Sequence, residues 1–367
     1  MIEGHGDDRY KYGDIRADFS SNIPSSEGGE GGERAALREH LSARLDLIER
    51  YPEPEPYTLE RELAAAAGLE PTEVMATNGA TEAIYLVAHL LGCEGFVGAG
   101  FGRAGEGRAA IVEPTFAEYA DACRLHGLDP EAISEPWAQL PEGCGSLWCC
   151  NPNNPTGRAW ERERLLRAIE ARPEVMFVVD QSYEAFTRRP TLSAAEAVAH
   201  PNVILIRSMT KRYAVPGLRI GYLVAAEEVC RRLRRLRMPW SVNALAIEAG
   251  RFLLRRGGES FSLDGLLGET ARLAERLREV GASRGMGVFV PLPTDTHFML
   301  VEMGEGTASG EAVSAAELKE WLAREEGILI RNADNFRGLT PRHFRIATQS
   351  VADNDLLITA LERWISR

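Results

Sequence analysis

The chain has 367 residues, of which 44% are hydrophobic and 26% charged, the composition of an ordinary soluble globular protein. A single core seldom grows beyond roughly 250–300 residues, so this length predicts two domains. The formal net charge is −12, from 42 basic and 54 acidic side chains, which argues against a nucleic-acid partner. No apolar stretch reaches the roughly 20 residues of a membrane span, and the first residues do not resemble a signal peptide, so no membrane partner is expected.

Cysteine usage predicts the compartment. The six cysteines, at positions 93, 123, 144, 149, 150 and 230, show no Cys-x-x-Cys spacing. In a chain of this size they predict reduced, mostly buried thiols and a cytoplasmic protein, without a zinc site or any other metal site. Arginines between 231 and 237 are interleaved with leucines, a pattern that predicts the solvated face of a helix.

The first 70 residues alternate between loops and helices. Residues 25–34 are rich in glycine and glutamate and predict a loop, whereas leucines at helical spacing predict a helix over 35–50. Alternating prolines over 51–56 forbid a helix and predict an extended segment. A further helix is expected over 58–67.

From about residue 74 to 245, short apolar or β-branched runs alternate with helical stretches. Strands are expected at 111–113, 147–149, 175–179, 203–206 and 220–224. Helices are expected at 81–91, 117–126, 161–171 and 227–238. This alternation predicts a parallel sheet with crossover helices, and ligands of such sheets bind at the carboxyl ends of the strands.

The last third of the chain predicts a second domain of α+β type. Helices are expected at 245–257, 267–280, 315–324 and 353–365. Strands are expected at 287–289, 297–301, 328–330 and 343–347. We therefore divide the chain into an N-terminal segment (1–45) that joins the small domain, a large domain (46–245) and a small domain (246–367).

The segment 208–222, Ser-Met-Thr-Lys-Arg-Tyr-Ala-Val-Pro-Gly-Leu-Arg-Ile-Gly-Tyr, carries the most informative pattern. A lysine amine forms a Schiff base with an aldehyde that is held beside it. Ser208, three residues before Lys211, and Arg219, eight residues after it, have the chemistry to bind a phosphate. Pyridoxal 5′-phosphate carries both an aldehyde and a phosphate. An isolated Ser-x-x-Lys is more often a surface lysine, so the other motifs decide.

Two further motifs follow the short apolar runs 74–75 and 111–113. Thr77–Ala83 opens a helix whose unpaired N–H groups suit an anion, with Gly79 allowing close approach; an ordinary capped helix is the alternative. In Glu113–Tyr119, Phe116 has the shape to stack on a planar ring, although a core phenylalanine is the alternative.

Polar residues complete the pattern. The turn 151–157, with two Asn-Pro steps, is rigid enough to aim the Asn154 amide at a phenolic oxygen. Asp180 ends a strand where a carboxylate keeps a pyridine nitrogen protonated, and Tyr183 follows within reach of the ring hydroxyl; a helix cap is the alternative for Asp180. Arg345, in a C-terminal strand, suits a substrate carboxylate or a structural salt bridge.

In the order and spacing of these motifs the chain resembles the fold-type-I pyridoxal-phosphate enzymes of the class I/II aminotransferase superfamily, over essentially its whole length. That resemblance implies an α/β fold, with a mostly parallel seven-stranded sheet in the large domain and a smaller α+β domain. It implies Lys211 as the Schiff-base lysine, Asp180 as the partner of the pyridinium and Phe116 as the stacking ring. The implied phosphate ligands are Ser208, Arg219 and the backbone of Gly79, Ala80 and Thr81. Asn154 and Tyr183 bind the ring oxygen, Arg345 binds the substrate carboxylate, and Tyr51 reaches the phosphate of a neighbouring subunit, which implies a homodimer.

Within the superfamily the chain resembles the branch of threonine-phosphate decarboxylases and histidinol-phosphate aminotransferases. The segments that carry this likeness are His5-Gly6, 18–23, 238–246 and 330–339. By analogy His5, Asn22 and Arg331 would bind the substrate phosphate and carboxylate. The chain departs from the pattern at Asp7-Asp8, because acids beside a phosphate site are unfavourable, and this puts His5 in doubt.

The resemblance implies a small-molecule substrate and three competing functions. The first is decarboxylation of L-threonine O-3-phosphate to an aminopropanol phosphate in cobalamin synthesis. The second is an aminotransferase acting on histidinol phosphate or another amino acid. The third is a non-catalytic pyridoxal-phosphate-binding regulator, which is disfavoured because no DNA-binding domain precedes the family core.

Overall fold

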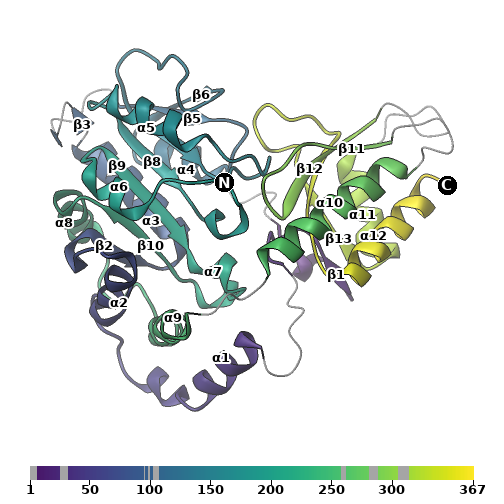
Figure 1. The fold of residues 1–367 in the computed structure, drawn as a ribbon, viewed down its shortest axis with the longest axis horizontal. Helices are drawn as coiled ribbons and strands as arrows, with labels where there is room; N and C mark the ends of the chain where they lie inside the picture. The colour runs from purple at the N-terminus through teal and green to yellow at the C-terminus, as the bar shows by residue number, and fades with distance from the viewer. Residues whose placement is uncertain are drawn as a thin grey trace.

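The computed structural model describes residues 6–24, 32–94, 96–97, 100–101, 107–257, 262–280, 288–304 and 314–367. A larger unit is built on a seven-stranded sheet and a smaller unit on a four-stranded sheet, and the two lie side by side (Figure 1). Within these ranges no helix is both long and apolar enough to cross a membrane.

The large sheet has the strand order β2-β10-β9-β8-β7-β5-β6. Its strands are β2 (Val74–Thr77), β5 (Arg108–Val112), β6 (Asp129–Ile133), β7 (Cys144–Cys150), β8 (Met176–Asp180), β9 (Val203–Ser208) and β10 (Gly221–Ala225). Strand β10 runs antiparallel to both of its neighbours, and the other pairings are parallel. The predicted mostly parallel sheet is confirmed. The sequence analysis missed β6, an edge strand that reads Asp-Pro-Glu-Ala-Ile and lacks an apolar pattern.

Helices cover both faces of this sheet, which is why its strands are apolar at successive positions. One core contains the buried sides of α3 (Gly79–Glu94), α4 (Glu118–Leu125) and α8 (Glu227–Leu236). The other contains those of α2 (Tyr57–Ala67), α5 (Arg162–Glu170), α6 (Ala194–Ala199) and α9 (Ala244–Arg256). Successive strand residues point to opposite cores, as Val74 and Met75 of β2 do.

The small unit packs helices on an antiparallel sheet. Its strands, in the order β11-β12-β15-β14, are β11 (Phe289–Pro291), β12 (Phe298–Met303), β15 (His343–Ala347) and β14 (Arg331–Asn332). Its core takes side chains from α10 (Leu263–Glu279), α11 (Ala315–Glu325) and α12 (Val351–Trp364). Near the N-terminus, β1 (Ala17–Asp18) pairs in parallel with β13 (Ile328–Leu329) and joins this unit.

Short elements complete the chain, and one of them corrects a predicted helix. They are α1 (Glu33–Ser42), α7 (Met209–Arg212), β3 (Phe96–Val97), β4 (Gly100–Phe101) and five 3₁₀ turns, η1 (Arg9–Lys11), η2 (Leu45–Glu49), η3 (Pro71–Glu73), η4 (Glu184–Phe186) and η5 (Pro216–Leu218). The helix expected over 35–50 is therefore broken at residues 43–44. Leu45 and Ile48 after the break are exposed, so no buried contact holds the two parts in one helix.

The hydrophobic cores of the large unit and the small unit do not divide the chain at the predicted boundaries, residues 45 and 245. Leu37 of α1 and the buried side of α9 belong to the core of the large unit, where α9 packs against α2. Ala17 and Phe19 belong to the core of the small unit. Figure 1 shows the same division: α1 lies beside α9, whereas β1 lies beside β13. The large unit thus includes α1 before residue 45 and all of α9 after residue 245.

The arginine cluster of α8 is more than a solvated face. Arg237, just after the helix, is 7% exposed, and it donates from Nη1 to Glu60 Oε1 and to the Ala76 carbonyl, both at 2.9 Å. Glu60, itself buried, accepts from the Ala76 N–H at 3.0 Å. This ion pair provides hydrogen-bond partners for the Ala76 N–H and carbonyl on the free edge of β2. Helical periodicity in the sequence does not predict this contact.

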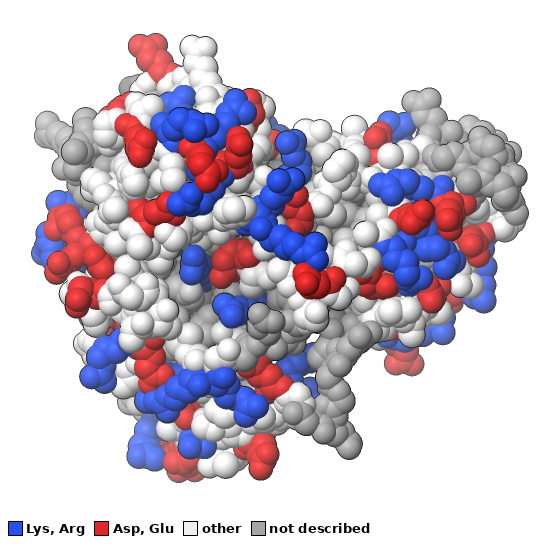
Figure 2. All heavy atoms as spheres, in the orientation of Figure 1, with Lys and Arg blue, Asp and Glu red and all other residues white. Residues whose placement is uncertain are grey.

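Charge on the visible surface is mixed. On the face shown in Figure 2, basic and acidic side chains are interleaved over both units. This face therefore presents no extended region of a single sign.

Candidate active site

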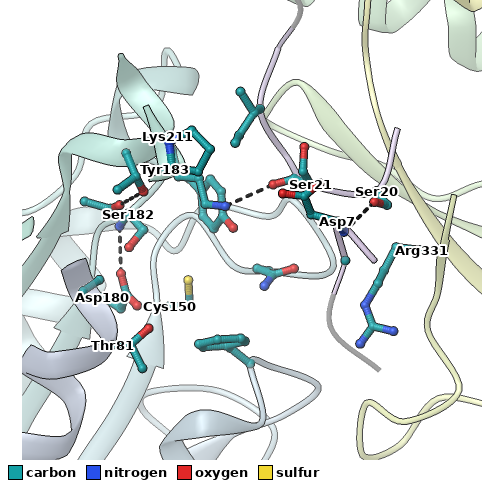
Figure 3. A pocket seen from close by; sticks show the side chains of 18 of the residues that line it. Asp7, Ser20, Ser21, Thr81, Cys150, Asp180, Ser182, Tyr183, Lys211 and Arg331 are labelled. Atoms are coloured by element: carbon teal, nitrogen blue, oxygen red, sulfur yellow. Dashed lines mark hydrogen bonds between the residues drawn. The ribbon is translucent and has the colours of Figure 1, made fainter. Parts of the chain in front are cut away.

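A cavity of about 220 Å³ lies where the carboxyl ends of the central strands of the large sheet face the small unit. Residues from both units form its wall (Figure 3). Among the residues predicted from the sequence, this wall contains Ala80, Thr81, Phe116, Asn154, Asp180, Tyr183, Ser208, Lys211, Arg219, Arg331 and Arg345. Figure 3 shows Asp180, Thr81 and Lys211 on one side of the cavity and Arg331 on the other.

Lys211 reaches the cavity from α7, the single helical turn that follows β9. Its Nζ donates to the Ser21 carbonyl at 3.0 Å. Burial of the amine, with the nearby charges of Arg345 and Arg219, lowers the pKa of Lys211 to about 8. A substantial fraction of the amine is therefore neutral near physiological pH, as nucleophilic attack on an aldehyde requires.

The start of α3 and the guanidinium of Arg219 form an anion site. Gly79 has a φ of +79°, and a Cβ there would lie 2.6 Å from Arg219 Nη2, so glycine is required for the guanidinium to lie against the helix. The free N–H groups of the first turn add a positive partial charge. Ser208 Oγ and Thr210 Oγ1 form a hydrogen bond of 2.6 Å, and both residues line the cavity.

Asp180 ends β8 as a buried carboxyl with two fixed donors. Its Oδ1 accepts from the Ser182 N–H at 2.8 Å, and its Oδ2 accepts from the Tyr119 hydroxyl at 2.7 Å. Burial raises the pKa of Asp180, against the opposing effects of Ser182, Tyr119 and the charge of Lys211. A buried carboxylate in this position suits a cationic partner in the cavity.

These groups fit pyridoxal 5′-phosphate. The helix start with Arg219 suits a phosphate, the amine of Lys211 suits an aldehyde, and Asp180 suits a protonated ring nitrogen. The structural observation that supports this fit is the positive φ of Gly79, with the Arg219 guanidinium so near the helix start that a Cβ would lie 2.6 Å from Nη2. Phe116 lines the same cavity and offers a ring for stacking.

Asn22, Tyr183 and Asn154 connect the cofactor side of the cavity to the small unit. Asn22 Nδ2 donates to the Tyr183 hydroxyl at 3.3 Å, and burial raises the pKa of Tyr183 to about 12, so that its hydroxyl keeps its proton. Asn154 Oδ1 accepts from Arg345 Nη1, and Arg345 Nη2 donates to the Ser20 carbonyl. The carbonyl of Asn22 also forms a hydrogen bond with His297 Nε2, at 3.1 Å.

Two buried arginines face each other on the substrate side. Arg331 and Arg345 are register partners across β14 and β15, and each is 5% exposed. Burial lowers the pKa of Arg331 to about 9, aided by the charge of Arg345, and burial lowers that of Arg345 to about 10. Across the described ranges neither forms an ion pair with a carboxylate, and Arg345 Nε has no hydrogen-bond partner. Both guanidinium groups donate to neutral oxygens, Arg331 to the Asn332 carbonyl and to Asn335 Oδ1, so their charges are not neutralised and favour anionic ligands.

Asp7 and Asp8, where the chain departs from the family pattern, lie in different surroundings. Asp8 pairs with Lys319 of α11 at 2.6 Å, outside the cavity. Asp7 lines the cavity, and its N–H donates to Ser20 Oγ at 2.8 Å. Burial and the neighbouring carboxyl of Asp18 raise the pKa of Asp7. One acid therefore remains beside the substrate space.

Four predicted residues are not among those that line the cavity: Gly79 and Asn22, which contact the lining residues Arg219 and Tyr183, and Tyr51 and His5. Tyr51 is 85% exposed and packs against Trp240, with ring centroids 5.4 Å apart, so it does not line the cavity of its own chain. His5 lies outside the described residues.

The sequence analysis missed several cavity residues. Tyr119 was noticed as part of a motif but given no role, although it follows Phe116 by three residues, about one helical turn, and could have been expected near it. Ser21 lies in the segment of likeness 18–23 and Asp7 was noted as a departure from the pattern, but no local signal places either residue beside Lys211.

Comparisons with known proteins agree with this geometry. The family described as aminotransferase class I and II matches residues 16–363. Threonine-phosphate decarboxylase of Salmonella typhimurium is 31% identical over 360 residues, covering 94% of this chain and 90% of that protein. The crystal structure of L-threonine-O-3-phosphate decarboxylase from Porphyromonas gingivalis matches with a TM-score of 0.82 and 32% identity, over 95% of this chain and 99% of the other. Histidinol-phosphate aminotransferase from Sinorhizobium meliloti, solved in complex with pyridoxal-5′-phosphate, has a similar fold, with a TM-score of 0.73 at 23% identity over 95% of this chain and 91% of that one.

Proposed function

Because the chain belongs to the class I and II aminotransferase family, an enzyme family that uses pyridoxal phosphate, we propose that it holds this cofactor covalently at Lys211. The first turn of α3, Ser208 and Arg219 would hold the phosphate. Phe116 would stack on the ring, with Asn154 and Tyr183 at the ring oxygen. Asp180 would hold the proton of the ring nitrogen. When bound, the cofactor supplies an electron sink for a bond broken at the substrate Cα.

The residues of this chain would then orient the substrate and move its protons. Arg345 would bind the carboxylate through its planar fork, in a cavity whose wall includes residues of both units. The amine of Lys211 would hold or take up a proton at Cα as a general acid and base, and its low pKa suits both roles.

The paired arginines support an amino acid with a second anionic group. A single carboxylate neutralises one buried guanidinium, whereas Arg331 and Arg345 together provide for two anions. A phosphorylated amino acid meets that requirement. We assign the carboxylate to Arg345 and the phosphate to Arg331, with Asn22 near the bound substrate and His5 as a further candidate ligand.

L-threonine O-3-phosphate is the substrate we propose, decarboxylated to an aminopropanol phosphate and CO2 as in cobalamin synthesis. The likeness to two threonine-phosphate decarboxylases supports this choice. An aminotransferase is the second candidate, because the same cavity residues serve both reactions and the family includes transaminases. The two reactions differ in which bond at Cα is broken, the bond to the carboxylate carbon or the bond to hydrogen.

One assay separates these candidates. The decarboxylase releases CO2 from L-threonine O-3-phosphate without any 2-oxo acid acceptor. Accumulation of pyridoxamine phosphate with a 2-oxo product would instead establish transamination. Arg331→Ala should raise KM for the phosphorylated substrate much more than for L-threonine. An equal rise in KM for both substrates would show that Arg331 does not bind the phosphate.

We also propose a cytoplasmic homodimer. Tyr51 and Trp240 stack at the surface, and Leu45, Ile48 and Met238 are further exposed apolar side chains of the nearby segments. A second copy that covers this apolar surface would bring Tyr51 toward its phosphate site. Sedimentation of a monomer at micromolar concentration, with full activity, would contradict the dimer. The free thiols of the described cysteines support a reducing compartment.

A further inference from the structure

The hydroxyl of Tyr119 is hydrogen-bonded to the carboxyl group of Asp180. It donates to Oδ2 at 2.7 Å, from a side chain that is 1% exposed. The Tyr119 ring is held edge-on by Phe116, with centroids 5.9 Å apart, and lies 6.1 Å from the Trp148 ring. These contacts fix the direction of the O–H bond, so the hydrogen bond is built into the core of the large unit.

The second oxygen of this carboxyl group is also occupied. The Ser182 N–H donates to Oδ1 at 2.8 Å, and a hydrogen bond from the Ser182 side chain also favours the ionised carboxylate. Two side-chain hydroxyls, those of Ser182 and Tyr119, are therefore contacts that a mutation can remove. Of the two, the Tyr119 hydroxyl is carried by a ring that is packed in the core.

We propose that Tyr119 is a positioning residue that keeps Asp180 ionised, so that the shared proton rests on the ring nitrogen of the bound cofactor. This role rests on the proposed function, because it requires pyridoxal phosphate at Lys211. Tyr119 acts through Asp180 and also lines the cavity.

The argument is one of relative basicity. A proton shared by a carboxylate and a pyridine nitrogen stays on the more basic of the two. An O–H donor stabilises the ionised carboxylate and makes it less basic, so removal of the donor moves the proton toward Asp180. The ring then loses positive charge and becomes a weaker electron sink, which slows the bond cleavage at Cα.

Tyr119 shares this task with the Ser182 side chain. Burial raises the pKa of Tyr119 well above its usual value, so it stays a donor. Burial also raises the pKa values of the Cys149 and Cys150 thiols on β7, the strand beside Asp180, so these thiols stay neutral. Lys211 favours the ionised carboxylate as well, but its charge is lost when its amine is neutral. The titratable groups facing Asp180 are Tyr119, Cys149, Cys150, Tyr183 and Lys211.

The first measurement uses the cofactor-free protein and carbon-13 NMR of labelled aspartate. Tyr119→Phe deletes the hydroxyl and keeps the ring packing, and we expect the titration midpoint of Asp180 to move to higher pH. Tyr85→Phe is the matched control, since the Tyr85 hydroxyl donates to the Glu118 carboxylate at 2.7 Å outside the cavity. This control should leave Asp180 unchanged. An unmoved Asp180 midpoint in folded Tyr119→Phe overturns the proposal.

The second measurement uses the cofactor-loaded protein. With nitrogen-15 in the pyridine ring, Tyr119→Phe should move the ring-nitrogen signal toward the unprotonated form and lower kcat roughly tenfold, with a smaller change in KM. A protonated ring nitrogen in the variant overturns the proposal. Replacement of tyrosine by the more acidic fluorotyrosine, without any mutation, should shift Asp180 the opposite way, which covers a variant that fails to fold. No shift there also overturns the proposal.

These outcomes separate the inference from the function on which it rests. If borohydride reduction of the wild-type protein with pyridoxal phosphate leaves Lys211 unlabelled, the proposed function fails, and the role of Tyr119 toward a cofactor fails with it. If Lys211 is labelled but the ring nitrogen ignores Tyr119→Phe, the inference alone fails.

Discussion

The lowered pKa of Lys211 makes a quantitative prediction for cofactor binding. The amine must be neutral to attack an aldehyde, and its pKa is about 8 in place of the ordinary 10.5, chiefly because of burial. At pH 7.5 about a quarter of such an amine is neutral, against roughly 0.1% of an ordinary lysine. We therefore expect the cofactor-free protein to combine with pyridoxal phosphate on the order of 200-fold faster than an unperturbed amine would allow.

The assay is stopped-flow absorbance of pyridoxal phosphate mixed with the cofactor-free protein between pH 7 and 10. A phosphate ester has its second pKa near 6, so the cofactor phosphate keeps its charge throughout this range. The second-order rate constant should rise and then level off above about pH 8. N-acetyl-lysine is the control and should show no plateau in this range. A rate that keeps rising with pH up to 10 would refute the reasoning.

The charges near this amine provide the perturbation. Arg345 is the largest electrostatic cause of the lowered pKa after burial. Arg345→Met should therefore move the plateau to higher pH, while Arg331→Met, whose charge is not among the principal causes, should move it less. Identical plateaus in the wild type and Arg345→Met would show that the guanidinium does not act on Lys211.

Three other changes test the packing and the specificity of the cavity. Arg237→Ala removes one of the two arginines that pair with the buried Glu60, each at 2.9 Å, and should lower the free energy of unfolding by about 2 kcal/mol in urea titrations; a loss below about 0.5 kcal/mol would show that this partner is dispensable. Gly157→Ala puts a Cβ 2.0 Å from Thr294 Oγ1 at a φ of +71°, so thermal unfolding should occur several degrees lower, and an unchanged Tm would contradict the contact between the two units. Asp7→Asn removes a carboxylate from the cavity and should lower KM for the phosphorylated substrate several-fold with little change for L-threonine; equal effects on both would place Asp7 away from the phosphate.

The order of elements and most cavity residues followed from local patterns. Apolar runs alternating with helical spacing predict a parallel sheet, and motifs that directly follow such strands must meet at one edge of it. This is why Asp180, Asn154 and Lys211, which end or follow three separate strands, lie around one cavity. The missed strand β6 and the broken helix over 35–50 show the limit of this argument. The edge strand β6 has no apolar pattern. Over 35–50 the apolar spacing continues past the break, but Leu45 and Ile48 are exposed, so packing decides where the helix ends.

What the sequence alone determined is the list of chemical groups and the strand ends that carry them, because those depend on residues close together in the chain. Only the tertiary structure decided which distant groups share a bond. Tyr119 reaches Asp180 across 61 positions, and Arg331 opposes Arg345 through the register of two strands. The same holds for Arg237, which is buried by its contact with Glu60. Hydrogen bonds and ion pairs depend on distances of a few ångströms between side chains, and these distances exist only after the sheet and its helices have packed.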